Sequence, residues 1–129
     1  MTVIDIARTD PVTTTPATPI DDVARLLRDE SVGCAIVTDG DDPRGIITDR
    51  DIAVRVAADN LDPEQMTAGD VMSETPVTVD ADAGVVDLCD TMATMGVRRV
   101  PIVSGDELVG IVTLDDLVVL LATELSDLA

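Results

Sequence analysis

Two halves of this 129-residue chain repeat at a fixed interval of 65 residues. The segment GIITDRD, which begins at Gly45, returns as GIVTLDD at Gly110, and Pro11 aligns with Pro76 under the same shift without a gap. Matches at the beginning, middle and end of both halves favour a tandem duplication. A unit of about 60 residues buries too little surface to be comfortably stable alone. We therefore expect two repeats that share a core, over residues 4–62 and 67–129.

Each repeat shows the same succession of hydrophobic patterns. A β-branched stretch precedes a segment with apolar residues at helical spacing, for which Thr18 and Asp82 are the predicted N-caps and Gly96 a predicted C-terminal signal. Two short apolar runs follow, separated by turn-forming residues, and then a second helical segment begins. The sequence predicts an α+β fold in which each repeat reads strand, helix, strand, strand, helix.

Charge and composition exclude several functions. The chain has 26 acidic residues, eight basic residues that are all arginine, and a net charge of -18. The negative electrostatic field of such a chain repels nucleic acid and anionic membranes, so we expect neither as a partner. The excess of Asp and the absence of Lys are similar to those of proteins from salt-loving microbes, because molar salt screens self-repulsion. The alternative is an ordinary acidic protein.

The residue types available leave little room for catalysis or metal binding. Without His or Lys, the chain has no Ser–His or Cys–His pair, no Schiff-base lysine and no P-loop lysine. We therefore expect no enzyme, no catalytic residues and no metal site. Cys34 and Cys89 are predicted to be small core residues. The N-terminus has no signal-peptide pattern and no apolar run is long enough for a membrane span, so we expect a cytoplasmic protein.

The recurring motif places Thr48 three residues before Asp51, and Thr113 three residues before Asp116, where a strand stops and a helix starts. One interpretation is a capping box, in which threonine and carboxylate satisfy the backbone N–H groups of the first helical turn. The other is a nucleotide site. A helix N-terminus attracts phosphate, and a carboxylate one turn further on can accept two hydrogen bonds from a ribose diol. The glycine that precedes each motif, Gly45 or Gly110, would allow close approach.

The doubled motif, together with AGDVMSETPVTV from Ala68 and GVRRVPIV from Gly96, resembles the CBS domain, and the pair resembles the tandem arrangement called a Bateman module. The resemblance covers residues 4–128. It implies that the repeats pack through their sheets about a pseudo-twofold axis. It also implies two clefts that bind adenosine nucleotides (AMP, ADP or ATP) or a related ligand such as S-adenosylmethionine, with no cofactor required.

The resemblance also implies the roles of individual residues. Asp51 and Asp116 would hold ribose hydroxyls, and Thr48 and Thr113 would contact phosphate. Each cleft would be shared between the repeats: the Asp51 cleft would borrow Val77, Thr78, Arg98 and Arg99, and the Asp116 cleft would borrow Val12 and Thr13.

The two predicted clefts differ in charge. Gly33 and Cys34 correspond to Arg98 and Arg99 under the 65-residue shift, and the second motif, which contains Leu114, has no arginine where the first motif has Arg50. We therefore expect the Asp51 cleft, with Arg50, to take a charged nucleotide, and the Asp116 cleft to take a less charged ligand or none. The alternative is that these arginines only pair with surface carboxylates.

A ligand-free scaffold is the competing function. The C-terminal segment LVVLLATELSDL is apolar enough to supply an interface, or it is buried in the chain's own core. The resemblance implies a regulatory module that forms a disc-like homodimer and acts on a partner protein that the sequence does not identify.

Overall fold

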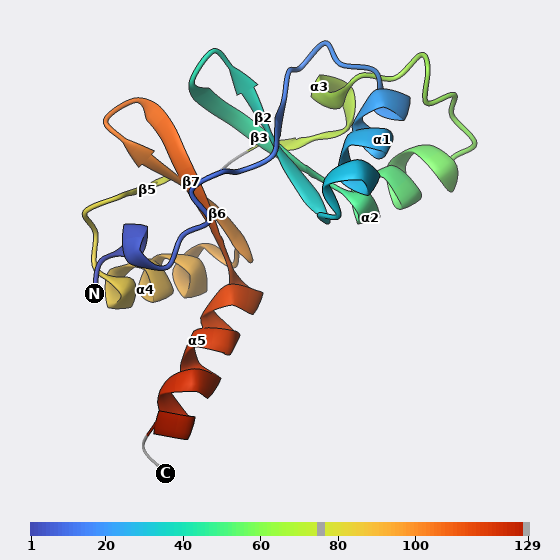
Figure 1. The fold of residues 1–129 in the computed structure, drawn as a ribbon. Coiled ribbons are helices and arrows are strands. Elements are labelled where there is room, and N and C mark those ends of the chain that lie inside the picture. The colour runs from blue at the N-terminus through green and yellow to red at the C-terminus, as the bar shows by residue number, and fades with distance from the viewer. Residues whose placement is uncertain (75–76, 128–129) are drawn as a thin grey trace. The chain divides into compact units, whose positions relative to one another are not determined.

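The computed structural model describes residues 1–74 and 77–127, and its chain divides into two compact units (Figure 1). Unit 2 is residues 11–75, and unit 1 combines residues 1–10 with residues 76–129. Pro76 and Leu128, which belong to the predicted repeats, lie outside the described residues.

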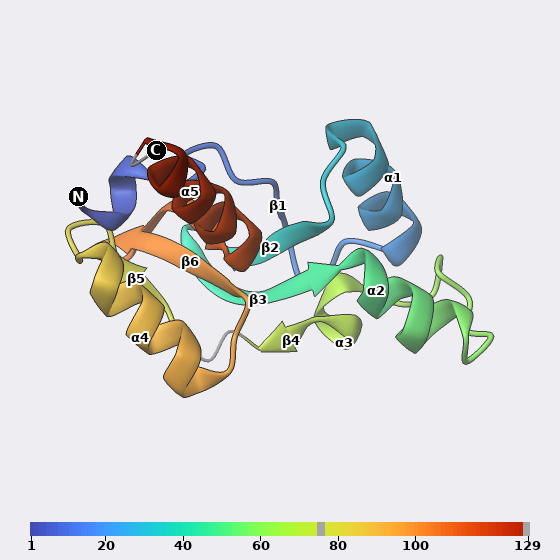
Figure 2. The same ribbon diagram turned by 90° about the horizontal axis from the view of Figure 1, so that it is seen from below.

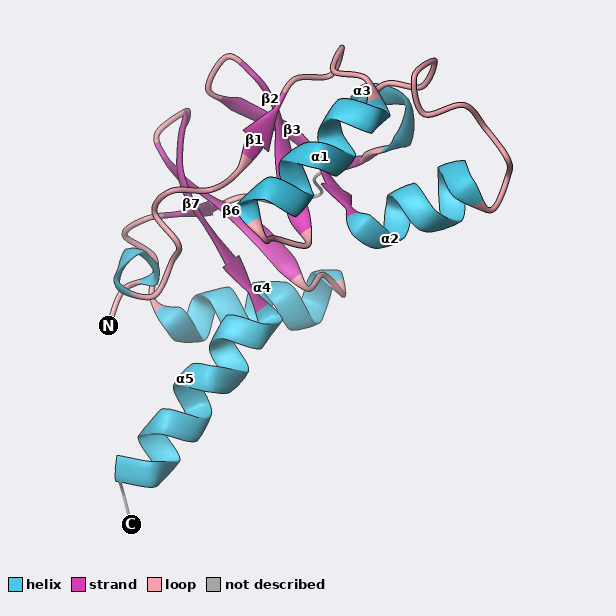
Figure 3. Ribbon diagram, turned by 45° about the vertical axis from the view of Figure 1, so that its right-hand side comes forward, coloured by secondary structure: helices cyan, strands magenta, loops and turns pink. Residues whose placement is uncertain are grey.

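Unit 2 is built on a four-stranded sheet whose order is β1-β2-β3-β4. Strand β1 runs parallel to β2, and the remaining pairs are antiparallel. The strands are β1 (Thr13–Thr14), β2 (Cys34–Asp39), β3 (Asp42–Thr48) and β4 (Ser73–Glu74); the helices are α1 (Ile20–Glu30), α2 (Asp49–Ile52), the π-helix η2 (Ala53–Ala57) and α3 (Ala68–Val71). Helices α1 and α2 contact each other (Figure 3). Ile20, Val23 and Leu27 recur on one face of α1 and are buried in the core of this unit.

Unit 1 is built on a three-stranded sheet whose order is β5-β6-β7. The elements are the 3-10 turn η1 (Val3–Asp5), β5 (Val79–Asp80), α4 (Val85–Met95), β6 (Arg99–Ser104), β7 (Glu107–Thr113) and α5 (Leu114–Asp127). Leu88 and Met92 of α4 are buried in one cluster with Val100 and Ile102 of β6, so α4 packs on the sheet (Figure 2). The predicted α+β class and the order of elements in each repeat are confirmed.

The helix ends differ in part from the prediction. Gly96 ends α4 with a φ of 64°, as predicted. The predicted N-caps are wrong, because α1 begins after Pro19 and α4 after Gly84. The hydroxyl of Thr18 instead lies 2.8 Å from that of Thr15, and the Asp82 N–H donates to the Asp80 carboxylate at 2.9 Å. The side chains of Thr18 and Asp80 therefore bond within the turns before α1 and α4.

The opening segments of the two repeats are exchanged between the units. In unit 1 the Val3 N–H donates to the Ala83 carbonyl at 2.8 Å, and in unit 2 the equivalent Ala68 N–H donates to the Thr18 carbonyl at 2.8 Å. Ala83 lies just before α4, and Thr18 lies just before α1. Each unit therefore contains the two-stranded hairpin of one sequence repeat and the opening segment of the other.

The prediction that both cysteines are core residues is wrong for Cys89, whose side chain is exposed on α4. Cys34 is partly buried at the start of β2. Among the described residues, no helix combines the length and the apolar character needed to cross a membrane.

Two candidate ligand half-sites

The predicted site residues gather at one end of each sheet. In unit 1, Arg99 at the start of β6 pairs with Thr113 at the end of β7, and Val79 of β5 pairs with Ile102. Val77 and Thr78 therefore lie within about two residues of the same end. We call this set the Thr113 half-site; it comprises Val77, Thr78, Arg98, Arg99, Thr113 and Asp116.

Unit 2 repeats this arrangement with different side chains. Cys34 at the start of β2 pairs with Thr48 at the end of β3, and Thr13 of β1 pairs with Ile36. We call this set the Thr48 half-site; it comprises Val12, Thr13, Thr48, Arg50 and Asp51. Val12 and its counterpart Val77 pack against the core of their own unit, whereas Thr13 and Thr78 are exposed.

The capping-box interpretation is realised at both motifs. The Thr48 N–H donates to the Asp51 carboxylate at 2.9 Å, and the Asp51 N–H donates to the Thr48 hydroxyl at 3.1 Å. The corresponding distances between Thr113 and Asp116 are 3.3 and 3.2 Å. Each box uses one carboxylate oxygen, Oδ2, so Oδ1 keeps its capacity to accept a hydrogen bond from a ligand hydroxyl.

The same box also forms at Thr2–Asp5 and Thr67–Asp70, which start η1 and α3. The backbone N–H and hydroxyl of Thr2 lower the pKa of Asp5. The Thr-x-x-Asp spacing therefore marks helix starts in this chain and does not identify a ligand site alone. What distinguishes Thr48 and Thr113 is the long strand that precedes each of them.

The two glycines before the motifs serve the exchanged segments. A Cβ on Gly45 would stand 2.6 Å from the Ser73 carbonyl oxygen, and a Cβ on Gly110 would stand 2.8 Å from the Arg8 carbonyl oxygen. From the sequence we expected these glycines to let a ligand come close to the strand. In the structure, the backbone of the exchanged opening segment lies against each glycine instead.

An arginine that the sequence analysis missed lies near each motif carboxylate. Arg55 Nε lies 3.9 Å from Asp51 Oδ1, and an Arg8 guanidinium nitrogen lies 3.8 Å from Asp116 Oδ1. Both arginines are more than half exposed, and such long surface pairs contribute little stability. The spacing of four residues between Asp51 and Arg55 was a usable signal, whereas Arg8 reaches Asp116 only through the segment exchange.

Three arginines of the half-sites have guanidinium groups that form no ion pair with a carboxylate of the described residues. Within the described residues, no ion pair involves Arg50, Arg98 or Arg99, although each of the other five arginines lies within 4 Å of a carboxylate; those five are Arg8, Arg25, Arg28, Arg44 and Arg55. The alternative interpretation, for a chain with 26 acidic residues, was that these three arginines only form ion pairs with surface carboxylates. The ion pairs that it requires do not occur in the described part of the chain.

The helix tips of the two half-sites differ. At Thr48, the Asp49 carboxylate accepts from the Arg50 N–H at 2.8 Å, so a protein anion already occupies the first turn. Leu114 stands in the place of Asp49 and offers no side-chain acceptor; its own N–H donates to the Arg98 carbonyl at 2.8 Å. The tip at Thr113 thus has an apolar residue in the position of Asp49, carries Asp115 in the position of Arg50, and adjoins Arg98 and Arg99. Their predicted grouping with Asp51 joins residues of two units and stays a prediction.

The chain thus consists of two duplicated α+β units, each of which has a threonine–aspartate turn at the end of its sheet. This architecture is that of a small tandem-repeat module. The profile of the CBS domain family matches residues 3–58 and 68–123, so the chain belongs to the CBS domain family and carries a CBS pair. The chain is 41% identical over 96 residues to Hypoxic response protein 1 of Mycobacterium tuberculosis, covering 73% of this chain and 66% of that protein. It is 36% identical to the CBS domain-containing protein YhcV of Bacillus subtilis, covering 89% and 81%.

Solved structures share this fold. The CBS domain protein PAE2072 from Pyrobaculum aerophilum, complexed with AMP, has a TM-score of 0.80 and 27% identity over 91% of this chain and 90% of that one. The CBS domain pair of protein MJ0100, in complex with 5′-methylthioadenosine and S-adenosyl-L-methionine, has a TM-score of 0.83 and 27% identity over 96% and 98%. The chain spans 59% of protein MK0525 of Methanopyrus kandleri and 66% of Hypoxic response protein 1.

Proposed function

We propose that this CBS pair is a regulatory module that senses an adenosine nucleotide or a related adenosyl ligand. The neighbours that bind AMP or S-adenosyl-L-methionine support a ligand-sensing role, and CBS pairs are generally regulatory modules rather than enzymes. The observation that carries the proposal is that the guanidinium groups of Arg50, Arg98 and Arg99 form no ion pair within the described part of a chain whose net charge is -18. Guanidinium groups held apart from carboxylates are suited to phosphate.

The roles follow from the chemistry of each side chain. Asp51 and Asp116 accept hydrogen bonds from ribose hydroxyls through the carboxylate oxygen that the cap leaves available. Thr48 and Thr113 contact phosphate, and the valines of the half-sites, Val12 and Val77, contribute apolar surface for the base. Each cleft draws on both repeats, so that Val12 and Thr13 serve the Asp116 side, whereas Val77 and Thr78 serve the Asp51 side.

The two sides take ligands of different charge. We assign the charged nucleotide to Asp51, with Arg50 and with Arg98 and Arg99 from the other repeat, and a less charged adenosyl ligand to Asp116. The arrangement within unit 1, where Arg98 and Arg99 adjoin Thr113, favours the reverse assignment. The first assignment predicts that Arg98 and Arg99 bind the same ligand as Asp51, and the reverse assignment predicts that they bind the same ligand as Asp116.

A ligand-free scaffold is the second candidate, and one observation favours it. Helix α5 contains no buried residue although most of its residues are apolar. Thermal unfolding in molar salt with AMP, ADP, ATP and S-adenosylmethionine separates the two functions. A ligand at one hundred times its Kd stabilises the folded state by about 2.7 kcal/mol. A rise in Tm that grows with ligand concentration supports the sensor, and a flat response to all four supports the scaffold.

The module acts through other protein chains. We expect a homodimer, in keeping with neighbours that assemble, such as the hexameric CBS-CP12 protein from bloom-forming cyanobacteria. We propose that a bound ligand affects the regulated partner through α2 and α5, because these helices begin directly after Thr48 and Thr113.

A further inference from the structure

We propose that Arg55 is a positioning residue for Asp51, and that it links a ligand bound there to the opening segment of the second repeat. The inference rests on the proposed function, in which Asp51 accepts hydrogen bonds from ribose hydroxyls. Arg55 lies in the π-helix η2, four residues beyond Asp51. It therefore faces the motif carboxylate from the next turn of the same helical segment.

The guanidinium group of Arg55 joins two parts of unit 2. Its Nη1 donates to the Val71 carbonyl at 2.9 Å, and its Nε lies 3.9 Å from Asp51 Oδ1. Val71 is the last residue of α3 and belongs to the buried core of the unit, so this hydrogen bond anchors the guanidinium group. The contact with Asp51 is electrostatic, because 3.9 Å is too long for a hydrogen bond. Oδ1 therefore has a cation beside it and can still accept from a ligand hydroxyl.

The orientation of the Asp51 carboxylate is fixed from both sides. Its Oδ2 accepts from the Thr48 N–H at 2.9 Å, and its Oδ1 lies beside the anchored Arg55. A carboxylate that is already oriented loses less freedom when a ligand binds, which raises affinity. Because Arg55 is half exposed and the ion pair is long, the contact contributes little to the stability of the fold. Its role is therefore sought in the use of Asp51.

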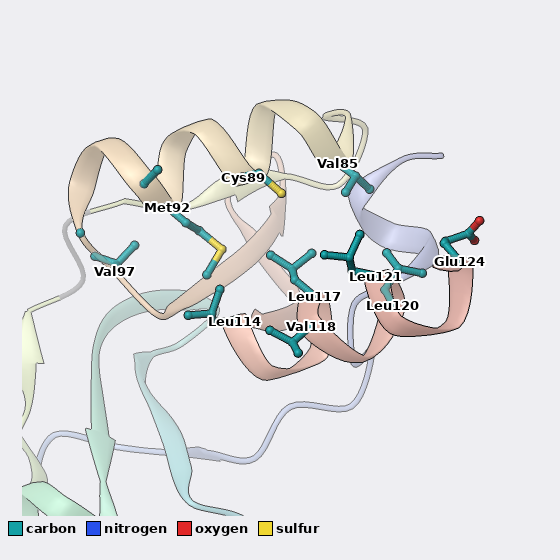
Figure 4. Close-up of a pocket in the computed structure, with 12 residues that line it drawn as sticks. Val85, Cys89, Met92, Val97, Leu114, Leu117, Val118, Leu120, Leu121 and Glu124 are labelled. Atoms are coloured by element: carbon teal, nitrogen blue, oxygen red, sulfur yellow. The ribbon is translucent and has the colours of Figure 1, made fainter. Parts of the chain in front are cut away.

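Unit 1 makes the same connection with a different residue. Under the 65-residue shift the counterpart of Arg55 is Leu120, an apolar side chain that lines a groove between α4 and α5 (Figure 4). Arg8 supplies the guanidinium group instead, with a nitrogen 3.8 Å from Asp116 Oδ1. Arg8 belongs to the opening segment of the first repeat, and its own counterpart is Ser73. The two arginines thus occupy positions that the duplication does not relate.

This recurrence at unrelated positions indicates a function for the contact. In each unit a guanidinium group lies beside the motif carboxylate and is tied to the opening segment that comes from the other repeat. In unit 2 the helix after the motif supplies the arginine, and in unit 1 the opening segment supplies it. Duplication alone would have placed both arginines at equivalent positions. A ligand at the carboxylate of one repeat is thereby coupled to a segment of the other repeat.

Calorimetry with AMP and with ATP in molar salt tests the positioning role. The variants are made in an Asp116→Ala chain, which keeps the Asp51 carboxylate. Arg55→Leu copies the residue at the equivalent position of unit 1. The matched control is Arg44→Leu, which removes the same charge from a side chain of unit 2 that is 54% exposed, against 51% for Arg55. Arg55→Leu combined with Asp51→Ala completes a double-mutant cycle, and Tm shows that each variant folds.

We expect Arg55→Leu to weaken AMP and ATP binding by the same factor, about three- to tenfold, with little change in Tm. The substitution has no effect once Asp51 is replaced by alanine, and Arg44→Leu leaves both affinities unchanged. A larger loss for ATP than for AMP indicates a direct phosphate contact and overturns the positioning role. Equal affinities of Arg55→Leu and Arg44→Leu also overturn it.

The outcome for the proposed function is read separately. AMP binding that is present in the natural chain and lost in Asp116→Ala overturns this inference and leaves the proposed function in place. A natural chain that binds none of AMP, ADP, ATP and S-adenosylmethionine overturns both.

Hydrogen exchange of residues 68–74 tests the link to the opening segment. We expect saturating AMP to slow exchange of these amides in the Asp116→Ala chain, because an Asp51 held by ligand keeps Arg55 on the Val71 carbonyl. In Arg55→Leu, saturating AMP leaves the exchange of this segment unchanged. Slowing to the same extent in both chains, or in neither, overturns the link.

Discussion

Gly110 lies directly against the backbone of Arg8, so that a Cβ on this glycine would stand 2.8 Å from the Arg8 carbonyl oxygen. The Arg8 N–H also donates to the carbonyl of Ile111, the next residue, at 3.0 Å. The backbone of Arg8 is thereby held against β7, the last strand of unit 1.

The first prediction is that Gly110→Ala destabilises the protein, because the new methyl group must displace backbone. We expect a loss of about 1–3 kcal/mol in the free energy of unfolding, measured by denaturant titration in molar salt. Gly33→Ala is the matched control, since a Cβ there meets Asp49 at an ordinary distance of 3.5 Å. Equal stability of the two variants would show that the opening segment is not packed against Gly110.

The second prediction concerns chain connectivity. Fragments 1–62 and 63–129 each lack the opening segment that completes their unit, because that segment belongs to the other fragment. We expect the separate fragments to lack cooperative unfolding and an equimolar mixture to recover it, as followed by circular dichroism. An isolated fragment that melts with the Tm of the whole chain would refute the exchange.

The third prediction is that salt stabilises the fold. The net charge of -18 on a chain of 129 residues destabilises the compact state in dilute buffer, and salt screens that repulsion. We expect Tm to rise steadily as KCl increases from dilute buffer to about 1 M and beyond. Constant Tm over that range would mark the protein as an ordinary acidic one.

The fourth prediction concerns whether Arg98 and Arg99 contribute to ligand binding at Asp51 or at Asp116. Arg98→Ala with Arg99→Ala is made in an Asp116→Ala background, which keeps the Asp51 cleft, and in an Asp51→Ala background, which keeps the Asp116 cleft. Our assignment expects ATP affinity to fall roughly tenfold or more in the first background and to stay unchanged in the second. The reverse pattern in calorimetry assigns both arginines to Asp116.

Patterns local in sequence were sufficient to predict the helix–strand order and the threonine–aspartate turns, because the capping box of Thr48 and Asp51 needs only neighbouring residues. Contacts made by the exchanged segments were not predictable in this way. The pairing of Arg8 with Ile111 and the approach of Arg8 to Asp116 depend on which sheet the opening segment joins. The role of Gly110 was misread for the same reason.

Exposure was equally hard to predict. The apolar pattern of α5 fits a core helix and an interface helix alike, and only the packing around it shows that Val119 and Leu125 are exposed. Thr18 and Asp82 do not act as caps: the Thr18 hydroxyl bonds to Thr15, and the Asp82 N–H donates to the Asp80 carboxylate, within the turn before each helix.

Isothermal titration with AMP in molar salt tests the central claim most directly, because it measures binding at the two motif carboxylates. The variant is Asp51→Ala combined with Asp116→Ala. The control is Asp70→Ala, which removes a capping-box carboxylate of the same kind outside both half-sites. We predict saturable binding by the natural chain and by Asp70→Ala, weakened roughly ten- to a hundredfold in the double variant. Equal affinity of all three proteins, or no binding of AMP, ADP, ATP or S-adenosylmethionine to the natural chain, would contradict the account.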